Sequence, residues 1–193
     1  SAATARLEAA AGVEFAEPVT TAQATRSPND TLYPLQWHYY EFPGGADLPP
    51  AWDVTLGSSG IVVAVVDTGI LYNHPDLAGR ALAGYDFVSE TRTSGDGDGR
   101  DGDPSDPGDW APANWCFPGS TAHDSSWHGS HVAGTIGAAT NNGSGVAGVN
   151  WTSKILPVRA LADCGGTTAD IADGIRWAAG LSVPGVPANP TPA

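Results

Sequence analysis

The chain has 193 residues, with 8 Lys and Arg against 21 Asp and Glu, and its formal net charge is −13 at pH 7. This balance argues against a protein that binds nucleic acid or docks on anionic lipid, because both tasks need clustered cations. Hydrophobic residues make up 41% of the chain and charged residues 15%, which suits one globular domain and not a disordered polyanion. No apolar run approaches the roughly 18 residues that a membrane span needs.

The first 24 residues differ in composition from the rest of the chain. Residues 1–11 are rich in Ala and predict a helix, residues 13–16 alternate like a short strand, and residues 20–29 are polar like a linker. This start is therefore expected to be a separate segment.

Apolar runs predict the strands of the main part. Residues 61–66 (IVVAVV) are followed by Asp67, and residues 82–88 and 154–161 are further strand candidates. A continuous β-branched run without alternation indicates a central parallel strand that is covered on both faces.

Two helices are expected between and after these strands. Apolar residues recur at helical spacing after His128, and residues 168–181 form the clearest helical pattern, with a cap in its Thr-Ala-Asp start. Strands that alternate with helices predict an α/β fold with a parallel sheet. Residues 94–109 read as an acidic, low-complexity loop, and the Pro-rich tail 182–193 should lack regular structure.

Two short motifs contain residues suited to catalysis. The first, VVDTGI at residues 65–70, places Asp67 at the carboxyl end of a buried strand, where catalytic groups gather in α/β sheets. Taken alone, Asp67 could also simply cap the next turn. The second, HGSHVAGT at residues 128–135, places His128 at a helix start; a surface His is the alternative, and the HExxH pattern of zinc proteases is missing.

Together the two motifs resemble those of the subtilisin-like serine proteases (subtilases) of the secreted bacterial type. The resemblance covers most of residues 28–185. It implies a doubly wound, mostly parallel α/β sheet of the subtilisin type, incomplete in this chain. It also implies that Asp67 orients the imidazole of His128, and that His128 is the general base toward a serine. Further stretches that resemble the family are His74-Pro75-Asp76-Leu77, Asn141-Asn142-Gly143 and Gly174-Ile175-Arg176-Trp177-Ala178.

The serine motif of the family is absent from residues 1–193. The resemblance therefore implies that residues 25–193 are the N-terminal part of a catalytic domain. We expect the C-terminal remainder to supply the serine as a second chain, after cleavage in the exposed tail 182–193; a truncated product is the alternative. Residues 1–24 are then expected to be a pro-segment remnant and processing linker of a zymogen, with cleavage near Ala24, an ordinary extension being the alternative.

These inferences predict a secreted, extracellular serine endopeptidase that acts on proteins or peptides. The alternative is a catalytically dead subtilase fold that serves as a calcium-dependent binding module. Substrate contact is expected where the family keeps an edge strand that pairs with extended peptide, before the last helix. Gly165, Gly166 and Thr168 lie there, and the glycines suit close backbone approach.

Calcium is the expected ion. Asp76, Asn142 and the loop that ends at Val146 resemble the family's high-affinity calcium site, with Asp30 as a further ligand. The acidic insert 94–109 is a second candidate because hard oxygen ligands on a Gly-rich chain favour calcium over zinc, and a merely solvated loop is its alternative. Its candidate ligands are Asp98, Asp103, Asp106 and Asp109.

The only two cysteines are Cys116 and Cys164. Their even number permits one disulfide, which suits a secreted protein and is the prediction here, two reduced buried thiols being the alternative.

Overall fold

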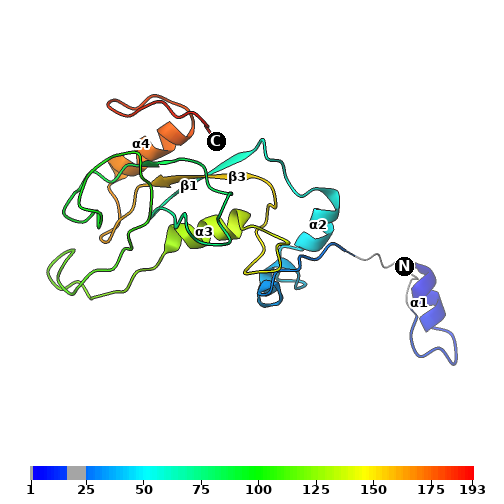
Figure 1. Cartoon of the computed structure of the whole chain (residues 1–193). Helices are drawn as coiled ribbons and strands as arrows, with labels where there is room; N and C mark the ends of the chain where they lie inside the picture. The colour runs from blue at the N-terminus through cyan, green and yellow to red at the C-terminus, as the bar shows by residue number, and fades with distance from the viewer. Residues whose placement is uncertain (1, 17–24) are drawn as a thin grey trace.

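The computed structural model describes residues 2–16 and 25–193, in which loops connect short helices and a small sheet (Figure 1). None of the helices in these residues is long and apolar enough to cross a lipid bilayer. In chain order the elements are α1 (Ala2–Glu8), η1 (Tyr33–Leu35), η2 (Trp37–Tyr39), α2 (Leu48–Val54), β1 (Val62–Asp67), β2 (Tyr85–Asp86), α3 (His128–Gly137), β3 (Lys154–Arg159) and α4 (Thr168–Ala178).

The three strands form one parallel sheet in the order β1-β3-β2. The register pairs Val62 with Lys154 at one end of β1 and Asp67 with Arg159 at the other. The predicted parallel sheet is thus confirmed, and the carboxyl ends of β1 and β3 lie side by side. Asp67 therefore stands at the edge where an α/β sheet usually places its functional groups.

Strand β2 is shorter than the predicted 82–88. Ala81 is bridged to Ile155 and Tyr85 pairs with Val158. The segment from Ala81 to Tyr85 is therefore one residue longer than the segment of β3 that it faces. The extra residue lies beside Pro157, which has no N–H to donate to a ladder. Regular pairing therefore resumes only at Tyr85.

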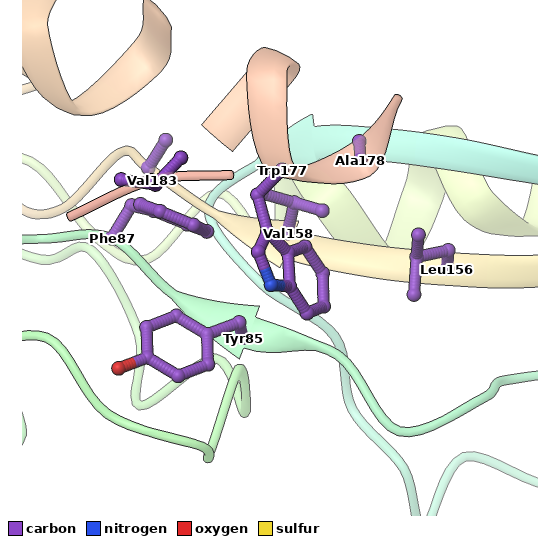
Figure 2. Close-up of a cluster of buried hydrophobic side chains, with 8 residues drawn as sticks. Tyr85, Phe87, Leu156, Val158, Trp177, Ala178 and Val183 are labelled. Carbon is purple, nitrogen blue, oxygen red and sulfur yellow. The ribbon is translucent and has the colours of Figure 1, made fainter. Parts of the chain in front are cut away.

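Helices α3 and α4 cover opposite faces of the sheet (Figure 1), which confirms the doubly wound arrangement. On the α3 face, Ala133 packs with Val65 and Ile155. On the α4 face an aromatic cluster fills the space between helix and sheet (Figure 2); its buried members are Tyr85, Phe87, Leu156, Val158, Ala160, Trp177, Ala178 and Val183.

The segment before β1 contains helices that the sequence patterns missed. Helix α2 begins with Leu48 and has prolines in its first turn, where a missing N–H costs nothing. Its Trp52 is buried against Tyr33 and Tyr39, which come from η1 and η2. The aromatics of this region lack a 3.6-residue period because short turns, not one long helix, place them in the core.

Three local expectations need correction. Residues 13–16 form no strand, because no neighbouring strand pairs with them and Phe15 is exposed. The helix predicted in residues 1–11 ends at Glu8, and α4 ends at Ala178, before the left-handed Gly180. The cap of α4 is Thr167, whose side chain accepts a hydrogen bond from the Asp170 N–H, so the cap lies one residue before the predicted start. The expected processing position near Ala24 lies outside the described residues.

Candidate catalytic site

Asp67 and His128 meet at the carboxyl end of β1. Asp67 is the last residue of that strand and His128 is the first residue of α3. The His128 Nδ1 atom lies 2.8 Å from both carboxylate oxygens of Asp67. The Asp67 side chain is 11% exposed and the His128 side chain is 60% exposed. One ring nitrogen therefore faces a largely buried carboxylate, while the rest of the ring is open to a reactant.

Small residues let the helix approach the strand so closely. A Cβ atom built at Gly129 would lie 2.2 Å from the Gly69 carbonyl oxygen, so no side chain fits there. Gly69 has φ of +105°, a conformation that L side chains rarely adopt. The Ser130 hydroxyl then accepts a hydrogen bond from the Leu71 N–H at 2.8 Å. The glycines of the DTG and HGS motifs therefore determine the position of His128.

A hydrogen-bonded connection leads from the Asp67–His128 pair into the acidic segment. The Thr68 N–H donates to Asp67 Oδ1 at 2.7 Å, and the Thr68 Oγ1 atom accepts from the Gly129 N–H at 3.0 Å. The same hydroxyl donates to Asp106 Oδ2 at 2.7 Å. Burial raises the pKa of Asp106 above its usual value, although the hydrogen bond from Thr68 acts in the opposite direction.

A second connection runs from Asp109 to the same helix. Asp109 accepts hydrogen bonds from the Ser126 N–H at 2.5 Å and from its hydroxyl at 2.7 Å. The Ser126 Oγ atom accepts from the His128 N–H at 3.3 Å. Burial opposes the ionisation of Asp109, but the hydrogen bonds from Ser126 outweigh it and lower the pKa. The end of the acidic segment is thus joined to the start of α3.

The acidic candidates for a metal site are not brought together. Asp98 is exposed, and Asp103 accepts hydrogen bonds from Ser105. Asp106 and Asp109 bond to Thr68 and Ser126 instead. In residues 2–16 and 25–193 no group of three or more His, Cys, Asp or Glu side chains is arranged to hold a metal ion. Asp103, Asp106 and Asp109 each bond to a different protein donor, and Asp98 is exposed to solvent.

Two arginines hold the acidic segment, and the sequence reasoning did not predict either contact. Arg159 at the end of β3 is buried and bonds to Asp86, Asp96 and the Ser94 carbonyl. Burial raises the pKa of Asp86 to about 6, against the influence of Arg159. The sequence signal was an Arg within the otherwise apolar strand candidate 154–161, because such a buried cation requires acidic partners.

The second arginine is Arg100, in the middle of the acidic run. It binds Asp170 at 2.6 Å and Asp173 at 2.8 Å, both in α4. The segment is therefore attached to the sheet, to α4 and to α3.

The expected calcium loop does converge on buried carboxylates. Asp76 is 4% exposed and accepts hydrogen bonds from Asn142 Nδ2 at 3.3 Å and from the Val146 N–H at 2.8 Å. Asp30 is 2% exposed and accepts from the N–H groups of Asn141 and Asn142. Neither carboxylate forms an ion pair within the described residues. Buried carboxylates without a cationic partner fit a hard cation.

The segment before α4 differs from the expected edge strand. Ala162 and Gly165 exchange two backbone hydrogen bonds, of 3.0 and 2.9 Å, and so close a tight turn. Thr168 is the first residue of α4 and not part of a strand. A Cβ at Gly166 would lie 2.1 Å from the Ala160 carbonyl, so Gly166 approaches its own chain closely. Gly166 is exposed and its N–H and C=O have no partner in the described part of the chain.

The predicted disulfide is present between Cys116 and Cys164. It joins the chain after the acidic segment to the turn that precedes Gly165. Both cysteines are therefore oxidised, and the alternative of two reduced thiols does not apply.

A parallel α/β sheet, with an Asp at the end of its first strand next to a His at the start of α3, is the arrangement that the resemblance to the subtilases implied. Residues 58–190 match the subtilase family of peptidases, and the chain belongs to that family.

Several relatives and solved structures are similar to it. It is 50% identical to an extracellular protease of Xanthomonas campestris pv. campestris, over 97% of this chain and 32% of that protein. It is also 50% identical to the extracellular basic protease of Dichelobacter nodosus, over 94% of this chain and 30% of that protein. A protease structure from Pseudoalteromonas arctica PAMC 21717 superimposes with a TM-score of 0.84 at 56% identity and covers 87% of this chain and 49% of that chain. The chain thus spans about a third of the length of these curated relatives.

Proposed function

We propose that this chain is the N-terminal part of the catalytic domain of a secreted serine endopeptidase. The observation that carries the proposal is the position of the His128 Nδ1 atom, 2.8 Å from both oxygens of the Asp67 carboxylate. The family membership and relatives named as extracellular proteases support it.

The proposed mechanism follows from the protonation of the imidazole ring. Asp67 accepts the Nδ1–H of His128, which leaves Nε2 unprotonated and able to act as a base. Nε2 takes the proton of a serine hydroxyl as that hydroxyl attacks the peptide carbonyl, and then donates it to the leaving amine. The serine belongs to the C-terminal remainder outside residues 1–193, carried on a second chain after cleavage between residues 182 and 193. The hydrogen bond from the Thr68 N–H helps to keep the Asp67 carboxylate in place.

The proposed substrate is an extended stretch of protein or peptide. Its backbone would pair with the free N–H and C=O of Gly166, which lies on the exposed segment before α4. Pairing through backbone groups gives affinity that tolerates many substrate sequences.

We also propose a structural calcium ion at the loop between α3 and β3. Asp76 and the oxygens of Asn142 and Val146 would hold it, with Asp30 bracing the loop from the N-terminal side. The ion would offset the charge of buried carboxylates and take no part in the chemistry.

The test uses the full-length protein from which this chain derives. We expect a fluorophosphonate to label a serine, and casein to be hydrolysed. His128→Ala should lower kcat about a thousandfold or more, because the general base is lost. His123→Ala, which removes an exposed imidazole from the same segment, is the matched control and should retain wild-type activity. Absence of both labelling and hydrolysis would favour the calcium-dependent binding module, and a label on the same chain as His128 would refute the two-chain arrangement.

A further inference from the structure

The acidic segment of residues 94–109 reaches the Asp67–His128 pair through two hydroxyl groups, those of Thr68 and Ser126. We propose that Asp106 is a positioning residue for His128 and acts on it through Thr68. This inference rests on the proposed function, in which His128 is the general base.

The first step concerns the direction of the Thr68 hydroxyl. The Oγ1 atom lies 2.7 Å from Asp106 Oδ2 and 3.0 Å from the Gly129 nitrogen. Because the Gly129 N–H can only donate, the hydroxyl must accept there and send its one proton to Asp106. The Asp106 carboxylate is fixed in place, since its Oδ1 atom accepts a hydrogen bond from the Gly108 N–H at 2.8 Å and Asp106 is only 5% exposed. The carboxylate therefore orients the hydroxyl.

The second step concerns what Thr68 joins. Its N–H donates to the Asp67 carboxylate, and its hydroxyl accepts from Gly129, the second residue of α3. The N–H groups in the first turn of a helix have no partner within the helix. Thr68 thus fixes the start of α3 and the Asp67 side chain at the same time. Any movement of Thr68 changes the separation between the Asp67 carboxylate and the imidazole.

The third step is a separate contact with the same helix start. Asp109 holds both the N–H and the hydroxyl of Ser126, and the Ser126 hydroxyl accepts from the His128 N–H. Two carboxylates of one segment therefore restrain two consecutive N–H groups of α3. This arrangement gives the end of the segment a role in catalysis that a solvated loop would lack.

The test is made in the full-length protein with Asp106→Asn, Thr68→Val and Thr68→Ser. In Asp106→Asn one of the two donors, Thr68 or Gly108, faces an amide NH₂ and loses its acceptor. We expect Asp106→Asn and Thr68→Val to lower kcat about tenfold each, equal to about 1.4 kcal/mol, with KM unchanged because no substrate contact is altered. The double variant should lose no more than either single variant, because both act on one connection. Thr68→Ser retains the hydroxyl and should therefore keep the wild-type kcat, in contrast to Thr68→Val.

A spectroscopic readout separates positioning from general stability. The proton NMR signal of the His128 Nδ1–H should move or broaden in Asp106→Asn and Thr68→Val and stay in place in Thr68→Ser. Asp124→Asn is the matched control, since it removes an exposed carboxylate, four residues before His128, that has no partner in residues 2–16 and 25–193; it should leave kcat and the signal unchanged.

Wild-type kcat together with an unchanged signal in Asp106→Asn would overturn the inference. So would an equal loss of kcat in Asp124→Asn. If Asp106→Asn does not fold, the comparison of Thr68→Val with Thr68→Ser decides. If the wild-type protein hydrolyses nothing, the proposed function fails, and the Nδ1–H signal still tests whether Asp106 positions the ring.

Discussion

At the residue scale, the contact between Asp67 and His128 depends on a residue without a side chain. Gly129 follows His128 directly and leaves no room for a Cβ against the Gly69 carbonyl. The imidazole of His128 can reach Asp67 only because the helix begins this close to the strand. A larger residue at position 129 would displace the start of α3 without changing the chemistry of either Asp67 or His128.

We predict that Gly129→Ala separates the two catalytic side chains. Overpacking at this contact should lower the free energy of unfolding by about 1–3 kcal/mol. The displacement of His128 should lower kcat by about a hundredfold, since small shifts in geometry are costly in catalysis. Enzyme kinetics and urea unfolding of the full-length protein check both effects. Gly102→Ala is the control, because a Cβ there meets nothing within 4 Å, and an equal loss in that variant would contradict the explanation.

At the element scale, two arginines tie the acidic segment to the rest of the fold, in addition to the hydrogen bonds of its own carboxylates. Arg159 bonds to Asp86 and Asp96 from the end of β3, and Arg100 bonds to α4. The segment is therefore a structural connection between the sheet and both covering helices. Its charges are partly neutralised within the protein even without a metal ion.

We predict that Arg159→Gln is strongly destabilising. The change leaves the buried Asp86 carboxylate without its cation, and breaking such a pair by removing one partner costs about 3–5 kcal/mol. Urea unfolding should show this loss as a lower midpoint. Arg176→Gln removes an exposed arginine from α4 and should change stability little. If the two variants are equally stable, the contacts of Arg159 with Asp86 and the acidic segment do not stabilise the fold.

The contact between Arg100 and α4 predicts a dependence on acid. Burial opposes the ionisation of Asp170, but hydrogen bonds from Arg100, Thr167 and Ser89 outweigh it and lower its pKa. A carboxyl whose pKa is lower in the folded state stabilises the fold above its unfolded pKa and loses this contribution as the pH falls through the folded pKa.

We therefore expect the Tm of the wild-type protein to fall between about pH 4 and pH 2. Asp170→Asn should be less stable at neutral pH and lose less Tm over this range. Thermal unfolding followed by circular dichroism at a series of pH values makes the comparison. Asp124→Asn should keep the wild-type dependence of Tm on pH. If Asp170→Asn also keeps it, groups other than Asp170 cause the acid sensitivity.

At the scale of the whole molecule, the sequence predicted the parallel sheet, its two covering helices and the Asp67–His128 pair. Each of these depends on a local pattern, either a continuous apolar run or a motif. The contacts of Arg159 could not be predicted in this way, because its partners Asp86 and Asp96 are distant from it in the sequence. Only the fold brings them next to Arg159. The density of aspartates in residues 94–109 likewise suggested a metal site there. In the structure the candidate carboxylates are not brought together, because several of them bond to different protein groups.

The disulfide is the one covalent link between distant parts of this chain. It closes a loop of 48 residues between Cys116 and Cys164. We predict that replacing both cysteines by serine lowers the free energy of unfolding by about 4 kcal/mol, through the larger entropy of the unfolded chain. Urea unfolding of the variant beside the unreduced wild-type protein measures the difference. Equal midpoints would show that the cross-link does not contribute to stability.

The net charge of −13 also predicts a response of the whole fold to calcium. An ion that binds only the folded state stabilises it by about 2.7 kcal/mol at one hundred times its dissociation constant. Excess EDTA should therefore lower the Tm of the wild-type protein. Asp76→Asn should remove this response, because the buried carboxylate that faces the α3–β3 loop is lost, while Asp124→Asn should retain it. If the Tm is the same in EDTA and in millimolar calcium, the stabilising ion is refuted. If Asp76→Asn still responds fully, the ion binds elsewhere, and the exposed carboxylates of the acidic segment become the next candidates.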